Sequence, residues 1–150
     1  MKLSLNTCIP SRSVARLPVP KPVLLVDDDN LSAMTVEAML ECVGVAADLA
    51  ENGRVAVAKA TEGDYACILM DIEMPVMDGL EATKVIRARE AESGLTAVKI
   101  IAVTGHTSTG IKVLCEKAGM TSMLLKPFGV DALRDKLAEV CGADLDLSDS

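Results

Sequence analysis

The amino-acid sequence predicts an α/β fold, a doubly wound parallel sheet of five strands with five helices. Five short apolar runs alternate along the chain with five segments of helical periodicity. The apolar runs show no clear polar alternation, which is typical of strands covered on both faces. The chain has 150 residues, of which 50% are hydrophobic, and this suits one domain with a substantial core.

The five strand-like runs are short and bounded by polar or glycine-containing segments. Their core must be aliphatic, because Tyr65 and Phe128 are the only two aromatic residues of the chain. The predicted strands are Val23–Val26, Val45–Ala50, Tyr65–Met70, Lys99–Val103 and Met123–Leu125.

The helical segments repeat apolar residues every three or four positions. The first runs from Leu31 to Cys42, and the second, Arg54–Thr61, is short and alanine-rich. The stripe of the fourth segment is Ile111, Leu114, Cys115 and Ala118. The last segment carries Val130, Leu133, Leu137 and Val140 and is predicted to stop before Gly142.

Capping residues mark where two of these helices begin. Asp29 or Asn30 is expected to cap the first helix. The third helix opens with Asp78-Gly-Leu-Glu81, a capping-box pattern in which Asp78 is the N-cap.

The two ends of the chain differ from the middle. Residues 1–21 contain prolines, and their apolar residues do not recur with a helix or strand period. We therefore interpret them as a disordered tail or linker, with an organelle transit peptide as the alternative. Residues 142–150 are interpreted as an acidic disordered tail. The domain is predicted to span residues 22–141.

Composition excludes several classes of function. The net charge of −7 argues against nucleic-acid binding, and no apolar run approaches the roughly 18 residues of a membrane span. The five cysteines form no C-x-x-C pair. We interpret them as small buried hydrophobic residues in a reducing compartment. The expected location is the cytoplasm, with the nucleus as an alternative.

Polar residues follow four of the predicted strands, at the point where each strand ends. Asp27 and Asp28 follow the first strand, Asp71 the third, Thr104 the fourth and Lys126 the fifth. Ligands of parallel sheets bind at the carboxyl ends of the strands, so we expect these side chains to meet. Gathered carboxylates repel one another unless a cation neutralises them, and a partly hydrated Mg²⁺ is the usual one.

A metal, an ammonium and a hydroxyl together match the oxygens of a phosphoryl group. Asp71, at the end of the third strand, which we expect to be central, is the predicted nucleophile that would form an aspartyl phosphate. Pro75 and Gly79 stiffen and turn the loop that follows. That loop can offer the backbone carbonyl of Glu73 as a further metal ligand, while Asp27 and Asp28 hold the metal from the side.

Four segments resemble the receiver domain of response regulators in two-component phosphorelays. They are "VLLVDDDN", "ILMDIEMPVMDGLEATKVIR", "IIAVTGHTS" and "MLLKPFG", in the order of that family. The resemblance covers about residues 22–141 and is most similar to receivers of hybrid histidine kinases or stand-alone plant receivers. One departure is Met123, at a position where the family often has an aromatic residue.

The resemblance implies a flavodoxin-like strand order of 2-1-3-4-5. It also implies phosphorylation of Asp71, Mg²⁺ binding by Asp27 and Asp28, and roles for Thr104 and Lys126 as sensor and ion-pair partner of the phosphoryl group. The implied partner is a histidine phosphotransfer protein or a histidine kinase. Such a chain catalyses its own phosphorylation and dephosphorylation without turning over a separate substrate.

The main alternative is a haloacid-dehalogenase-like phosphatase. In that interpretation Asp27 is the nucleophile and Asp29 the acid/base of a D-x-D motif. The acidic motif that this family has after its lysine is missing, and "MDIEMPVMDG" stays unexplained.

Overall fold

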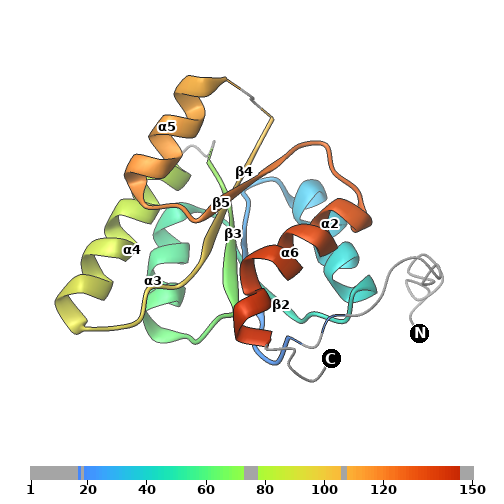
Figure 1. Ribbon diagram of the computed structural model, residues 1–150, viewed down its shortest axis with the longest axis horizontal. Coiled ribbons are helices and arrows are strands. Elements are labelled where there is room, and N and C mark those ends of the chain that lie inside the picture. The colour runs from blue at the N-terminus through green and yellow to red at the C-terminus, as the bar shows by residue number, and fades with distance from the viewer. Residues whose placement is uncertain (1–16, 18, 73–77, 106–107, 146–150) are drawn as a thin grey trace.

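The computed structural model of the chain describes residues 17, 19–72, 78–105 and 108–145 (Figure 1). Within them, five parallel strands form one sheet in the order β2-β1-β3-β4-β5, which confirms the predicted fold class and strand order. The strands are β1 (Val23–Val26), β2 (Ala47–Ala50), β3 (Cys67–Asp71), β4 (Ile100–Thr104) and β5 (Ser122–Leu125). The helices are α2 (Asn30–Cys42), α3 (Gly53–Glu62), α4 (Gly79–Ser93), α5 (Thr109–Ala118) and α6 (Val130–Leu145).

Helices α2 and α6 cover one face of the sheet, and α3, α4 and α5 cover the other (Figure 1). Alternate residues of β1 therefore enter two separate apolar clusters. Val23 and Leu25 pack in the cluster under α2 and α6, whereas Leu24 and Val26 pack in the cluster under α3 to α5. Every residue of β1 is buried, which explains why the run shows no polar alternation.

The helices begin at side chains that satisfy free backbone N–H groups. Asp29 accepts from the N–H of Ser32 and caps α2, and Asp78 accepts from the N–H of Glu81 and caps α4, as predicted. Asn52 caps α3 and Ser108 caps α5, which the sequence interpretation did not single out. Each cap stabilises its helix by about 1 kcal/mol.

The edges of the folded region differ from the predicted boundaries. Leu17 is buried in the core, and its N–H donates to the carbonyl oxygen of Val43. Helix α6 continues past the predicted stop before Gly142 to Leu145. A single glycine costs only about 1 kcal/mol in a helix, which is not enough to end one. The N–H of Val19 donates to the carbonyl oxygen of Leu17, and Lys21 forms an ion pair with Asp64, so residues 19–21 also belong to the described part. Residues 1–16, 18 and 146–150 of the two predicted tails lie outside the described residues.

The four cysteines among the described residues are of two kinds, and Cys8 lies outside that part of the chain. Cys67, Cys115 and Cys141 are buried free thiols, as expected for small hydrophobic residues. Cys42, at the end of α2, is disulfide-bonded. The expectation that all five cysteines are reduced is therefore wrong.

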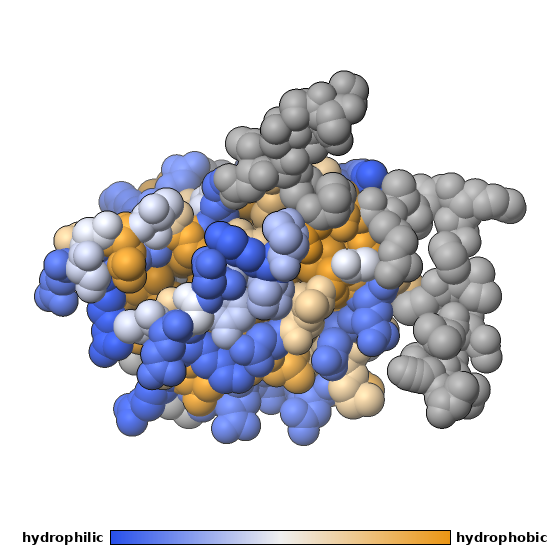
Figure 2. All heavy atoms as spheres, turned by 90° about the horizontal axis from the view of Figure 1, so that it is seen from below, coloured by the Kyte–Doolittle hydropathy of each residue, from blue (hydrophilic) through white to orange (hydrophobic). Residues whose placement is uncertain are grey.

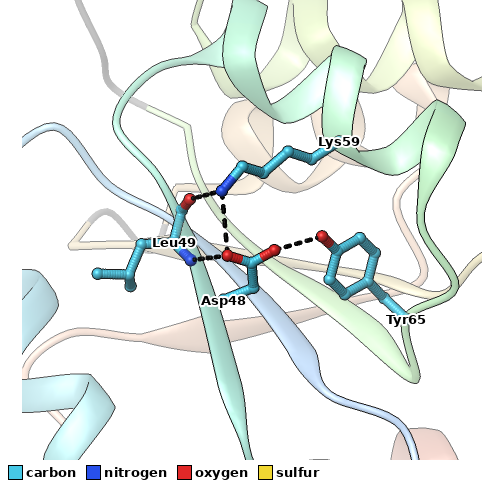
Figure 3. A network of polar contacts seen from close by, with 4 residues as sticks. All are labelled: Asp48, Leu49, Lys59 and Tyr65. Atoms are coloured by element: carbon cyan, nitrogen blue, oxygen red, sulfur yellow. Dashed lines mark hydrogen bonds and ion pairs between the residues drawn. The ribbon is translucent and has the colours of Figure 1, made fainter.

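A polar network fastens the edge strand β2 to its neighbours (Figure 3). The carboxylate of Asp48 accepts from the hydroxyl of Tyr65 at 2.6 Å and from the ammonium of Lys59 at 3.0 Å. Lys59 also donates to the carbonyl oxygen of Leu49 at 2.7 Å. The network joins β2 to α3 and to the segment that enters β3, and it holds the pKa of Asp48 below its usual value, chiefly through the bond from Tyr65.

Among the described residues, no helix is both long and apolar enough to cross a membrane. The face seen from below in Figure 2 is largely hydrophilic, with hydrophobic residues showing between the polar ones. On the visible part of that face, hydrophilic residues therefore separate the hydrophobic areas.

Candidate functional site

The parallel register of the sheet brings the ends of β1, β3, β4 and β5 to one edge. Val26 of β1 is paired with Met70 of β3, so Asp27, which follows β1, and Asp71, the last residue of β3, are neighbours. Thr104, the last residue of β4, is paired with Leu125, and Lys126 follows directly. The predicted convergence of strand ends is thus a consequence of register.

Asp27, Asp28 and Asp71 form an acidic cluster in which one carboxylate oxygen of each lies within 4.8 Å of the others. Asp27 and Asp71 are buried, with 8% and 6% of their surface exposed, whereas Asp28 is exposed. An oxygen of Asp27 also accepts the N–H of Asp29 at 2.9 Å, which fixes the carboxylate in place. Oxygen donors at this spacing fit a hard divalent cation such as Mg²⁺, which takes few protein ligands and keeps several waters.

Lys126 supplies a positive charge next to Asp71. Its ammonium lies 3.7 Å from an oxygen of Asp71, and its side chain is about a third exposed (36%). The backbone N–H of Lys126 donates to the carbonyl oxygen of Thr104 at 2.8 Å, so the end of β4 positions the lysine. Thr104 itself is buried, with 1% of its surface exposed.

Gly79 acts at this site in a way that the sequence interpretation missed. We expected it to permit a turn, but it is the first residue of α4 and packs against the backbone of the acceptor strand. A Cβ at this position would lie 2.7 Å from the Cα of Ile72 and would also clash with the carbonyl oxygen of Asp71. Only glycine fits without displacing the chain that carries Asp71.

A cavity of about 250 Å³ adjoins the acidic cluster. Asp27, Asp71 and Lys126 line one part of it, and mostly apolar side chains that include Met39 and Phe128 line the rest. It lies beneath α2, so this helix forms one wall of the site. Glu73, predicted to offer a carbonyl to the metal, lies outside the described residues.

The chain matches the profile of the response regulator receiver domain over residues 23–138. The sensor protein GacS of Pseudomonas syringae pv. syringae is 37% identical over 105 residues, which cover 70% of this chain and 12% of that protein. Hybrid signal transduction histidine kinase M of Dictyostelium discoideum is 38% identical over 107 residues, which cover 70% of this chain and 4% of that protein. The chain thus spans only a small part of these curated relatives.

Two solved structures show the same fold with sequence similarity. The receiver domain of the sensor histidine kinase PA1611 from Pseudomonas aeruginosa, with a magnesium ion in its active-site cleft, superposes with a TM-score of 0.73 at 38% identity, covering 81% of this chain and 98% of that one. The receiver domain of the Saccharomyces cerevisiae response regulator Ssk1, crystallised with the histidine phosphotransfer protein Ypd1, gives a TM-score of 0.80 at 31% identity, covering 86% and 94%.

The phosphatase alternative gains no support from these similarities. Its acid/base candidate, Asp29, is exposed, and its carboxylate caps α2 by accepting from Ser32 at 3.2 Å. The matched profile, the strand order and the acidic cluster agree with one another, and the chain belongs to the response regulator receiver domain family.

Proposed function

We propose that this chain accepts a phosphoryl group from a phosphohistidine onto Asp71, with Mg²⁺ held in the acidic cluster. The observation that carries the proposal is the convergence on Asp71 of two further carboxylates, within 4.8 Å, and of the Lys126 ammonium at 3.7 Å. A cation bound in the acidic cluster would neutralise the carboxylates, and the Lys126 ammonium would attract the negatively charged phosphoryl group.

Asp71 is a better nucleophile candidate than its two neighbours. It ends β3, the middle strand of the sheet, and lies beside the Lys126 ammonium, whereas Asp27 and Asp28 follow the neighbouring strand β1 and Asp28 is exposed. Its oxygen attacks the phosphorus, the P–N bond of phosphohistidine breaks, and the electron pair of that bond stays on the imidazole nitrogen. The product is an acyl phosphate on Asp71.

The other site residues act on the charge of the transferred group. Mg²⁺, when bound, would neutralise negative charge on the phosphoryl oxygens. Asp27 and Asp28 hold the ion, Lys126 pairs with a phosphoryl oxygen, and the hydroxyl of Thr104 donates to another. The same groups would assist attack by water, so the chain would catalyse both its phosphorylation and its dephosphorylation.

We further propose that the donor is a histidine phosphotransfer protein or a histidine kinase and that it docks on α2. Leu31 and Met34 on this helix are 71% and 62% exposed, which makes them the two most exposed large hydrophobic side chains among the described residues. Helix α2 begins next to the acidic cluster, so a partner seated there would bring its histidine close to Asp71. The complex of the Ssk1 receiver with Ypd1 supports a partner of this class. The three free thiols favour the cytoplasm as the place of this exchange, whereas the disulfide of Cys42 does not.

Phosphodonor labelling tests the acceptor. Wild-type chain incubated with acetyl phosphate and Mg²⁺ should gain the mass of one labile phosphoryl group, and Asp71→Asn should gain none. Asp78→Asn is the matched control, because it makes the same substitution at a helix cap that asparagine also fills well. Undiminished labelling of Asp71→Asn would overturn the assignment.

A further inference from the structure

Two buried thiols meet at the end of the sheet where the strands begin, away from the acidic cluster. Cys67 is the first residue of β3 and Cys141 lies near the end of α6, and both are free. They are 0% and 1% exposed and share one apolar cluster. The sulfur of Cys141 lies 3.9 Å from the carbonyl oxygen of Ala66, the residue before Cys67, so the two thiols are close neighbours.

One member of the pair, Cys141, borders a hollow of about 730 Å³. Cys141 lines this hollow together with Lys21, Tyr65 and Lys99, so part of its wall is polar. A small polar oxidant can enter such a space, whereas a bulky thiol reagent meets side chains that are almost fully buried.

We propose that Cys67 and Cys141 are a redox pair that a hydroperoxide converts into an intramolecular disulfide. The thiolate of one cysteine attacks a peroxide oxygen, the O–O bond breaks, and a sulfenic acid and one water (or alcohol) result. The second sulfur then displaces the sulfenic hydroxyl, which leaves as water when it takes up the remaining thiol proton. Two thiols lose two electrons and two protons in total, and the peroxide is reduced.

The crosslink would join the strand that carries the acceptor to the helix that follows Lys126. β3 runs from Cys67 to Asp71, and α6 begins shortly after the lysine. Closing so long a segment of chain restricts the unfolded state, so the oxidised protein should unfold roughly 10 °C above the reduced one. This inference concerns a different place from the phosphoryl site and does not depend on the proposed function.

The environment of the pair sets the speed of the reaction. The hydrogen bond with Cys141, and then burial, raise the pKa of Cys67 well above its ordinary value, against a smaller opposite effect of the Lys99 charge. The reactive thiolate is therefore a small fraction at neutral pH. Oxidation should be slow near neutrality and should accelerate about tenfold for each pH unit.

The experiment uses the full chain purified without reductant, so that Cys42 keeps its disulfide. After treatment with hydrogen peroxide, the number of thiols titrated in denaturant should fall by two. Peptide mapping should recover a fragment pair joined through Cys67 and Cys141. The matched control is Cys115→Ala, which removes the other buried free thiol and should leave the joined fragments unchanged.

Other outcomes would overturn the inference. If Cys67 and Cys141 stay reduced, or are oxidised without being joined, while the fold is intact by circular dichroism, the pair does not act as a redox pair. Cys141→Ala should abolish the joined fragments. A joined chain that unfolds at the same temperature as the reduced chain would contradict the proposed restraint of α6.

Discussion

Replacing Asp71 by asparagine should stabilise the protein when no metal is bound. The carboxylate of Asp71 is 8% exposed and lies within 4.8 Å of those of Asp27 and Asp28. Asparagine keeps the shape of the side chain and removes one of three crowded negative charges. It also removes the attraction to Lys126 at 3.7 Å, so the net effect depends on the balance of the two.

The distances allow that balance to be estimated. A pair of unit charges at the upper limit of 4.8 Å repels by about 1 kcal/mol in a water-like medium and by about 3.5 kcal/mol at an effective dielectric constant of 20. At 3.7 Å, the attraction to Lys126 is about 1 and about 4.5 kcal/mol in the same two media. The substitution removes two repulsions and one attraction, and the repulsions are the larger sum. Without metal, the free energy of unfolding of Asp71→Asn should therefore exceed that of wild type by roughly 1–2 kcal/mol, and its unfolding temperature should be roughly 3–6 °C higher.

With Mg²⁺ bound, wild type should become more stable than Asp71→Asn. At a Mg²⁺ concentration of 100 times the Kd, ligand binding raises the free energy of unfolding of wild type by about 2.7 kcal/mol. The variant has one carboxylate fewer to bind the ion, so the increase is smaller. Thermal unfolding of both proteins, with a chelator and with saturating Mg²⁺, measures the two differences. Asp78→Asn should respond to Mg²⁺ as wild type does. If Asp71→Asn is no more stable than wild type with the chelator, or gains as much from Mg²⁺, the charge argument is wrong.

Three further predictions concern other parts of the molecule. Tyr65→Phe removes a 2.6 Å hydrogen bond to Asp48 and should lower the free energy of unfolding by about 1 kcal/mol in urea titrations. Asp48→Asn also removes the charge that faces Lys59 and should cost more. Burial, and then the bond to Asp48, raise the pKa of Tyr65 from 10.0 to about 12, so this stabilisation is complete below pH 10 and is lost as pH rises through 12. An absorbance titration with all phenolate formed near pH 10 would contradict this. Gly79→Ala should destabilise by about 2–3 kcal/mol and slow acetyl phosphate labelling, because its Cβ overlaps the acceptor backbone; equal labelling rates would refute the packing argument. Leu31→Asp should slow transfer from a histidine phosphotransfer protein at least tenfold and leave acetyl phosphate labelling unchanged, whereas Leu114→Asp, on α5, should affect neither.

Part of the candidate site could be predicted from the sequence because each of its residues lies at the end of a strand or directly after it. Once the runs are recognised as parallel strands, Asp27, Asp71, Thr104 and Lys126 must lie at one edge, since parallel strands end on the same side. The role of Gly79 could not be read in this way. Its close approach to the backbone of Ile72 depends on how α4 returns toward β3, which no local pattern records.

The sequence by itself determined the alternation of strands and helices, the burial of the sheet and the capping of α2 and α4, because these depend on residue type over short distances. Only the tertiary structure decided which side chains far apart in sequence touch. Cys67 and Cys141 meet because α6 packs across the sheet onto the start of β3, and α6 passes Gly142 because the cost of one glycine is small. Such contacts depend on the packing of whole elements, and packing is a property of the assembled core rather than of any local stretch of chain.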